Sequence, residues 1–172
     1  RIRLRIDPDR HKHFRSTDKL EISREEVTWR PRGNFSRVSY EFTVNHRRSA
    51  NGYDSLMSEE WALFRGDRLV PRLRVTARPG LTARTTFEFV LPEGWSIATA
   101  YAPHGTATFA IDDPKRSLDR PLGWMLAGKI GVRADKIAHV QATIAAPVGE
   151  SARRQDTLAF LNWNLPYLLE VF

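Results

Sequence analysis

The chain has 172 residues, of which 41% are hydrophobic and 27% charged, and this composition excludes a largely disordered protein. It contains no cysteine, which excludes disulfides, thiolate metal sites and a cysteine nucleophile. The net charge is +7, and no apolar run approaches the roughly 18 residues of a membrane span, so we expect no helix that crosses a membrane.

The N-terminal region carries most of the positive charge. Residues 1–48 contain 13 Lys or Arg and 7 Asp or Glu, a surplus of 6. Arginines alternate with Ile2, Leu4 and Ile6, which predicts a half-buried strand whose outer face is solvated. We therefore do not expect a nucleic-acid partner. The stretch His11-Lys12-His13 is interpreted as an exposed polar segment of this basic region, not as a metal site.

Short strands separated by turn signals follow along the chain. Residues 35–44 show the clearest alternation, and residues 61–70 predict a hairpin with Gly66 and Asp67 at its tip. Turn signals at intervals of about 8–12 residues predict an antiparallel β-sandwich of about eight short strands. The later strands are expected at residues 73–77, 85–91, 95–101, 106–111 and 137–145.

The C-terminal segment 151–172 has the spacing of an amphipathic helix, in which Pro166 is expected to introduce a kink or a break. The apolar stripe needs a partner surface, either the sheet of the same domain or a further domain. We therefore divide the chain into a β-sandwich accessory domain, residues 1–150, and a helix, residues 151–172, that leads into a catalytic domain missing from this sequence. The stripe consists of Leu158, Leu161, Leu165, Leu168, Leu169 and Phe172.

A complete catalytic centre is not evident in the sequence. The His-Glu-x-x-His signature of zinc peptidases and a glycine-rich phosphate loop are both absent. Ser96 lacks the closing glycine of a nucleophile elbow. Asp112 and Asp113 precede Pro114 and are interpreted as turn-capping residues. Of the five tryptophans, Trp124 follows a Gly- and Pro-rich loop and is expected at the surface or an interface.

Two motifs resemble the N-terminal domain of glycyl aminopeptidase-type zinc metallopeptidases, a thermolysin-like (gluzincin) family. The first is the segment Leu91–Ala100, which reads LPEGWSIATA, and the second is Ser117–Gly123, which reads SLDRPLG. The segment VSYEF at residues 38–42 is similar to an early strand of that family. Together these segments place the resemblance over residues 35–172.

The resemblance implies an N-terminal β-sandwich that precedes a catalytic domain holding the zinc ligands and the catalytic glutamate. This chain would then contain no cofactor, and zinc would be expected in the missing domain of a bacterial aminopeptidase-like hydrolase. Its partners would be that C-terminal domain of the same polypeptide and a peptide substrate. Asp119, Arg120 and Trp124 are the candidates for a wall of the substrate cleft.

An alternative function is a free-standing β-sandwich module that binds carbohydrate or protein through exposed tryptophans. The sequence does not determine the compartment, although an exported or periplasmic location is slightly favoured. Whether the parent protein is an active enzyme is likewise left open at this point.

Overall fold

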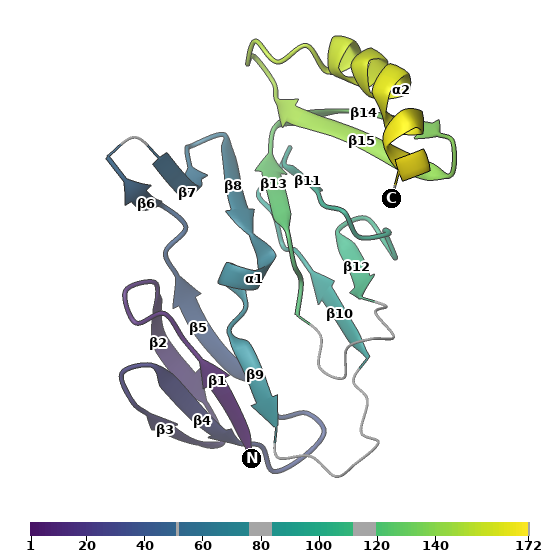
Figure 1. Ribbon diagram of the computed structural model, residues 1–172. Helices are drawn as coiled ribbons and strands as arrows, with labels where there is room; N and C mark the ends of the chain where they lie inside the picture. Colours follow the sequence, from purple (N-terminus) through teal and green to yellow (C-terminus); the bar gives the residue numbers. More distant parts are fainter. Residues whose placement is uncertain (51, 76–83, 112–119, 172) are drawn as a thin grey trace.

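The computed structural model describes residues 1–50, 52–75, 84–111 and 120–171 (Figure 1). The predicted class is confirmed, because the structure is mainly β, its strand pairs are antiparallel and a helix lies at the C-terminal end. The described residues form fifteen strands, more than the approximately eight expected, because several predicted strands and loops fold into shorter paired segments. No helix in the described part is long and apolar enough to cross a membrane.

The first sheet has four strands whose apolar side chains share one face, although Thr28 on the other face is also buried. Leu4 and Val27 point to the inner face and are buried, whereas the arginines between them point outward. This confirms the prediction for residues 1–6 and explains it, since every second side chain of a strand lies on the same face. In spatial order the strands are β3 (Lys19–Ile22), β4 (Glu26–Arg30), β1 (Ile2–Arg5) and β9 (Arg72–Val75).

The second sheet has five strands and carries the largest apolar cluster. Buried Ala62, Phe64, Met125 and Ala127 pack against partly buried hydrophobic side chains. One of these is Phe87 of β10 (Thr85–Glu88), the strand that pairs with β12 (Thr108–Ile111). The rings of Phe87 and Phe109 on that pair stack with centroids 5.2 Å apart. In order the strands are β11 (Ser96–Ala98), β13 (Trp124–Gly128), β8 (Trp61–Arg65), β7 (Gly52–Met57) and β6 (His46–Ser49).

The predicted hairpin at residues 61–70 is wrong. After β8 the chain forms a one-turn helix, α1 (Gly66–Leu69), and then crosses to the first sheet, where β9 pairs with β1. Gly66 is buried, and a Cβ there would lie 2.8 Å from Met125 Cε and 2.9 Å from Pro121 Cβ. Position 66 therefore requires a glycine, because the chain packs closely against Met125 and Pro121 where it crosses between the sheets. A further pair, β2 (His11–Ser16) with β5 (Val38–Phe42), lies beside the first sheet (Figure 1).

The last part of the chain forms a hairpin covered by the C-terminal helix. Strands β14 (Ile130–Ile137) and β15 (Val140–Pro147) are joined by a two-residue turn, so the single strand predicted at 137–145 is wrong at its start. The helix α2 (Arg154–Val171) continues through Pro166 without dividing. Its Leu158, Leu161 and Leu165 pack against Ile137, Ala142 and Ile144 of this hairpin. The predicted stripe thus finds part of its partner surface within the chain.

Candidate functional site

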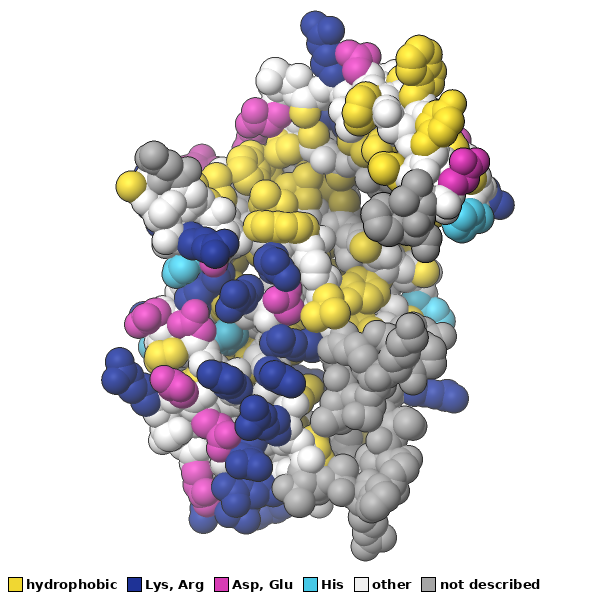
Figure 2. All heavy atoms as spheres, viewed as in Figure 1, with side chains coloured by type: hydrophobic (Ala, Val, Ile, Leu, Met, Phe, Trp, Pro, Cys, Tyr) yellow, Lys and Arg dark blue, Asp and Glu magenta, His cyan; other side chains and the backbone are white. Residues whose placement is uncertain are grey.

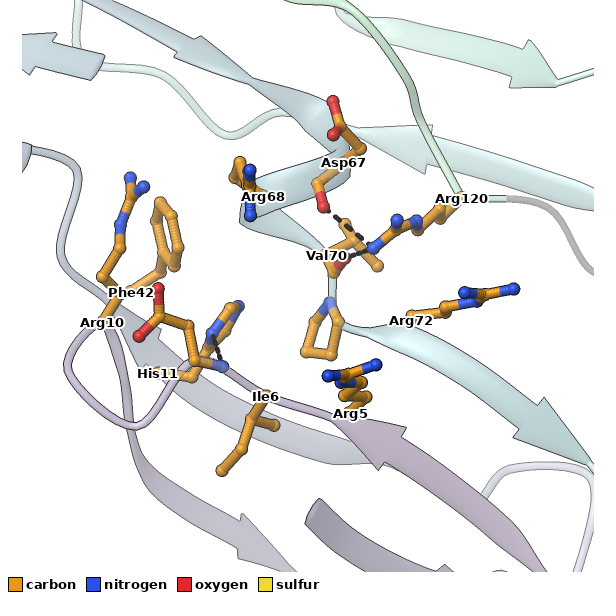
Figure 3. Close-up of a pocket in the computed structure, with 12 residues that line it drawn as sticks. Arg5, Ile6, Arg10, His11, Phe42, Asp67, Arg68, Val70, Arg72 and Arg120 are labelled. Atoms are coloured by element: carbon orange, nitrogen blue, oxygen red, sulfur yellow. Dashed lines mark hydrogen bonds between the residues drawn. The ribbon is translucent and has the colours of Figure 1, made fainter. Parts of the chain in front are cut away.

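A cavity of about 340 Å³ lies where the first sheet, the β2–β5 pair and α1 meet (Figure 3). We call it the junction pocket. Its lining combines five arginines and two aspartates with a small apolar surface. The residues are Arg5, Ile6, Asp7, Arg10, His11, Phe42, Asp67, Arg68, Val70, Pro71, Arg72 and Arg120.

Of the three residues predicted for a substrate cleft, one lines this pocket. Arg120 Nη1 donates hydrogen bonds to the carbonyl oxygens of Asp67, at 2.8 Å, and Val70, at 3.2 Å. Trp124 begins β13, is 49% exposed and does not line the pocket. The Arg65 guanidinium lies 5.9 Å from the centre of its ring. Asp119 lies outside the described residues, so a common site for the three stays a prediction.

Arg10 forms the buried side of the pocket and is only 3% exposed. Its Nε donates to Thr43 O at 3.1 Å, and its Nη2 donates to Val44 O at 3.1 Å and to Ser55 Oγ at 2.7 Å. The guanidinium also stacks over the Phe42 ring at 4.3 Å. Burial lowers the pKa of Arg10, and the neighbouring Asp54 carboxylate opposes that change. Because its donors are already engaged, Arg10 fixes the pocket wall.

His11 is buried beside Arg10, which corrects the expectation of an exposed polar segment; Lys12 and His13 are exposed as expected. The Asp7 backbone N–H donates to His11 Nδ1 at 3.1 Å. The other ring nitrogen, Nε2, lies 3.3 Å from Leu69 O, so it is the nitrogen that carries the proton. The Tyr40 hydroxyl donates to the same carbonyl oxygen at 2.8 Å, and burial raises the Tyr40 pKa to about 12.

Burial lowers the pKa of His11 below its ordinary value of 6.5, because the charged imidazolium loses its solvation. The unfolded chain therefore takes up a proton near pH 6.5 while the folded chain does not. Stability is fully present above that pH and is lost as the pH falls toward the lower folded value. We expect the free energy of unfolding to drop by about 1 kcal/mol between pH 7.5 and 5.5. Urea unfolding at the two pH values measures this loss.

The control for this prediction is the exposed His139 in the β14–β15 turn. His139→Gln should retain the loss, whereas His11→Gln should largely abolish it. Asp54 and Asp67 do not interfere, since their pKa values lie below the ordinary 3.8 and outside this pH window. Burial raises both values, but hydrogen bonds from His46 and Arg65 outweigh it. Equal losses in the two histidine variants would contradict the assignment to His11.

Ser55, His46 and Asp54 lie near one another but are not arranged as a catalytic triad. His46 Nδ1 lies 2.6 Å from Asp54 Oδ1, as in such a triad. The Ser55 hydroxyl, however, donates to Val44 O and accepts from Arg10, and Ser55 is 2% exposed. Its oxygen is thus committed to the backbone and withdrawn from solvent. Within the described ranges no three His, Asp or Glu side chains converge on a possible metal position.

The junction pocket could not be identified from the sequence. Arg5, Arg68, Arg72 and Arg120 come from different elements, and the fold alone brings them together. His11 is buried because it pairs with Phe42 of β5 at an inward position, and this pairing is known only from the fold. Arg10 gave no signal either, because a single arginine after a turn is usually solvated.

Comparisons with known proteins show a similarity in fold. No family model and no curated protein sequence matches the chain. A solved structure, the aminopeptidase N family protein of Idiomarina loihiensis, superposes on 94% of this chain with a TM-score of 0.65 and 13% sequence identity. The match covers 30% of that protein's chain. The fold of the present chain therefore resembles a minor part of an aminopeptidase N family protein.

Proposed function

We propose that this chain is a non-catalytic, β-rich accessory domain of a zinc metallopeptidase-like protein. The observation that carries the proposal is the match of nearly the whole chain to less than a third of an aminopeptidase N family protein. The motifs LPEGWSIATA at 91–100 and SLDRPLG at 117–123 support the finer assignment to the glycyl aminopeptidase type. The domain would buttress a catalytic domain and contribute a wall of its substrate cleft.

The proposed catalytic domain would supply the zinc ion and its ligands. Zinc in such a domain activates water for peptide-bond hydrolysis. No residue of the present chain is assigned as a ligand or as a general base. Asp119, Arg120 and Trp124 remain the candidates for contacts with a peptide substrate, and of these Trp124 offers a half-exposed ring beside a guanidinium.

Helix α2 offers a surface on which the catalytic domain of the same polypeptide could pack. One face is used within the chain, but Phe160, Trp163 and Tyr167 lie on another and are 65%, 81% and 72% exposed. Their spacing of three and four residues aligns them along the helix. Large exposed apolar patches of this kind commonly mark protein interfaces.

The reading frame beyond Phe172 tests the proposal. We expect a His-Glu-x-x-His motif within roughly 100 residues of it. The protein encoded by the full frame should hydrolyse aminoacyl nitroanilides, and a zinc chelator should abolish this activity. A stop codon directly after Phe172, or a following domain without zinc-ligand spacing, would contradict the proposal.

The alternative is a free-standing carbohydrate- or protein-binding module, and the exposure of Trp163 and Trp124 is the observation that favours it. Stacking of a sugar on either ring would change tryptophan fluorescence. Titration of the chain with a panel of polysaccharides would therefore give a saturable signal, and Trp163→Ala or Trp124→Ala should remove it. A flat response across the panel would leave protein docking as the use of these rings.

A further inference from the structure

Four arginines face one another on the outer side of the first sheet. The antiparallel register of β1 and β9 places Arg3 opposite Arg74 and Arg5 opposite Arg72. We call these four residues the arginine face. Side chains directly opposite in such a pair have Cβ atoms about 4.5–5.5 Å apart, and like charges at this separation destabilise the sheet. The arrangement is therefore costly unless another group neutralises it.

One acidic side chain offsets part of this charge, because Glu26 of β4 is directly opposite Arg5 on the other side of β1. No carboxylate oxygen in the described part of the chain lies within 4 Å of the Arg5, Arg72 or Arg68 guanidinium, so these three form no close ion pair there. Figure 2 shows dark-blue Lys and Arg side chains gathered in a band over β1 and β9 and toward α1. The face of the molecule drawn there thus carries a band of positive charge.

The arginine face ends in a concave site. Arg5 and Arg72 line the junction pocket, and Arg68 and Arg120 reach it from α1 and from the segment before β13 (Figure 3). Of the two aspartates in the lining, Asp67 is already bonded to Arg65 through both carboxylate oxygens, at 3.0 and 3.3 Å. Arg10 and His11 hold the inner wall rigid through bonds to the backbone and to Ser55. The pocket therefore presents excess positive charge on a preorganised support.

We propose that the junction pocket binds a small anion that carries two or more phosphate groups. The planar guanidinium donates two parallel hydrogen bonds to a phosphate, which suits arginine better than lysine for this purpose. One phosphate would be bound by the opposed pair Arg5 and Arg72, and a second would lie near Arg68. The volume of about 340 Å³ accommodates such a group but not an extended polymer. Val70 and Pro71 offer apolar contact to a small organic portion.

Nucleic acid fits this surface less well. Single strands are held by aromatic rings interleaved with basic residues. The aromatic ring of the first sheet, Trp29, is in register with Ile2 and lies on the opposite, inner face from the arginines. Phe42 in the pocket is covered by the Arg10 guanidinium. A compact phosphate compound is the ligand that the side chains favour. This inference does not depend on the proposed peptidase role.

Isothermal titration calorimetry of the 172-residue chain with tripolyphosphate tests the site. We expect saturable binding of one anion per chain, and orthophosphate should bind at least about tenfold more weakly because it engages fewer guanidinium groups. The double variant Arg5→Gln, Arg72→Gln should weaken tripolyphosphate binding by at least about tenfold. The double variant Arg133→Gln, Lys136→Gln removes the same two charges from exposed positions of β14 and should leave the affinity within about twofold.

Folding of the double variant is checked without ligand. Since both side chains are exposed and repel each other, its urea midpoint should equal or exceed that of the unaltered chain. The proposal is overturned if tripolyphosphate gives no saturable heat, or if the Arg133→Gln, Lys136→Gln variant weakens binding as much as the pocket variant does. It is also overturned if short single-stranded DNA binds more tightly than tripolyphosphate and depends on the same arginines, since the surface would then be a nucleic-acid site.

Discussion

Gly128→Ala should destabilise the fold by about 3 kcal/mol or more, because the substitution combines backbone strain with a backbone clash. Gly128 has a φ of +145°, a region that L side chains rarely adopt. A Cβ at this position would lie 2.4 Å from Glu60 O and 2.6 Å from Trp61 Cα. Both atoms belong to the backbone of the neighbouring strand region and cannot rotate away. Urea unfolding followed by tryptophan fluorescence measures the loss.

Gly128 has a large effect because it lies between two neighbouring strands. It ends β13 and is in register with Trp61 of β8 on one side and Ser96 of β11 on the other. Displacing it would disturb both pairings. Gly33→Ala is the matched control, since no heavy atom lies within 4 Å of its Cβ and its change should stay within about 0.5 kcal/mol. Similar urea midpoints for the two variants would contradict the local geometry.

Arg10→Met should cost about 2–4 kcal/mol of unfolding free energy, since it keeps the length of the side chain but removes every donor. Thr43 O, Val44 O and Ser55 Oγ would each lose a partner in a site where Arg10 is 3% exposed. Asp54, which lies 3.8 Å from Arg10 Nη1, would also lose a neighbouring cation. Chemical unfolding at pH 7.5 quantifies the effect.

Arg65→Met provides the comparison, because Arg65 also forms an ion pair but its side chain is 44% exposed. Exposed pairs contribute little, so its loss should be about 1 kcal/mol or less. Arg10→Lys is the second test. A lysine retains the charge but cannot donate to two carbonyls and a hydroxyl in the same planar arrangement, so it should restore less than half of the lost stability. A full rescue by lysine would show that charge alone matters at this position.

The sequence predicts individual strands well where they alternate, and poorly where turns lack the usual residues. Residues 1–6 and 35–44 show clear alternation, and both contain strands in the structure. The turn between β14 and β15 consists of Ala138 and His139, and Ala138 has a φ of +53°. Without Gly, Asn or Asp, nothing marks this turn, so the turn and most of β15 were predicted as one strand at residues 137–145, and β14 was missed.

Gly66 and Asp67 led to the opposite error, a hairpin turn predicted where the structure has none. They are typical of a hairpin tip, yet here they begin one turn of helix before the chain leaves the sheet. This local conformation depends on Pro121 and Met125, which pack against Gly66 although they are more than fifty residues away in the sequence. Tertiary contacts of this kind are not visible in a local pattern. The same holds for the junction pocket, whose arginines looked like the solvated face of separate strands.

The carbonyl groups that follow α1 have a consequence for the shape of the molecule. Leu69 O accepts from both Tyr40 and His11, and Val70 O accepts from Arg120. Apolar packing holds surfaces together without prescribing an angle between them, whereas hydrogen bonds weaken steeply when they are bent. The end of α1 is therefore held in a fixed direction relative to the β2–β5 pair, which supplies Tyr40 and His11.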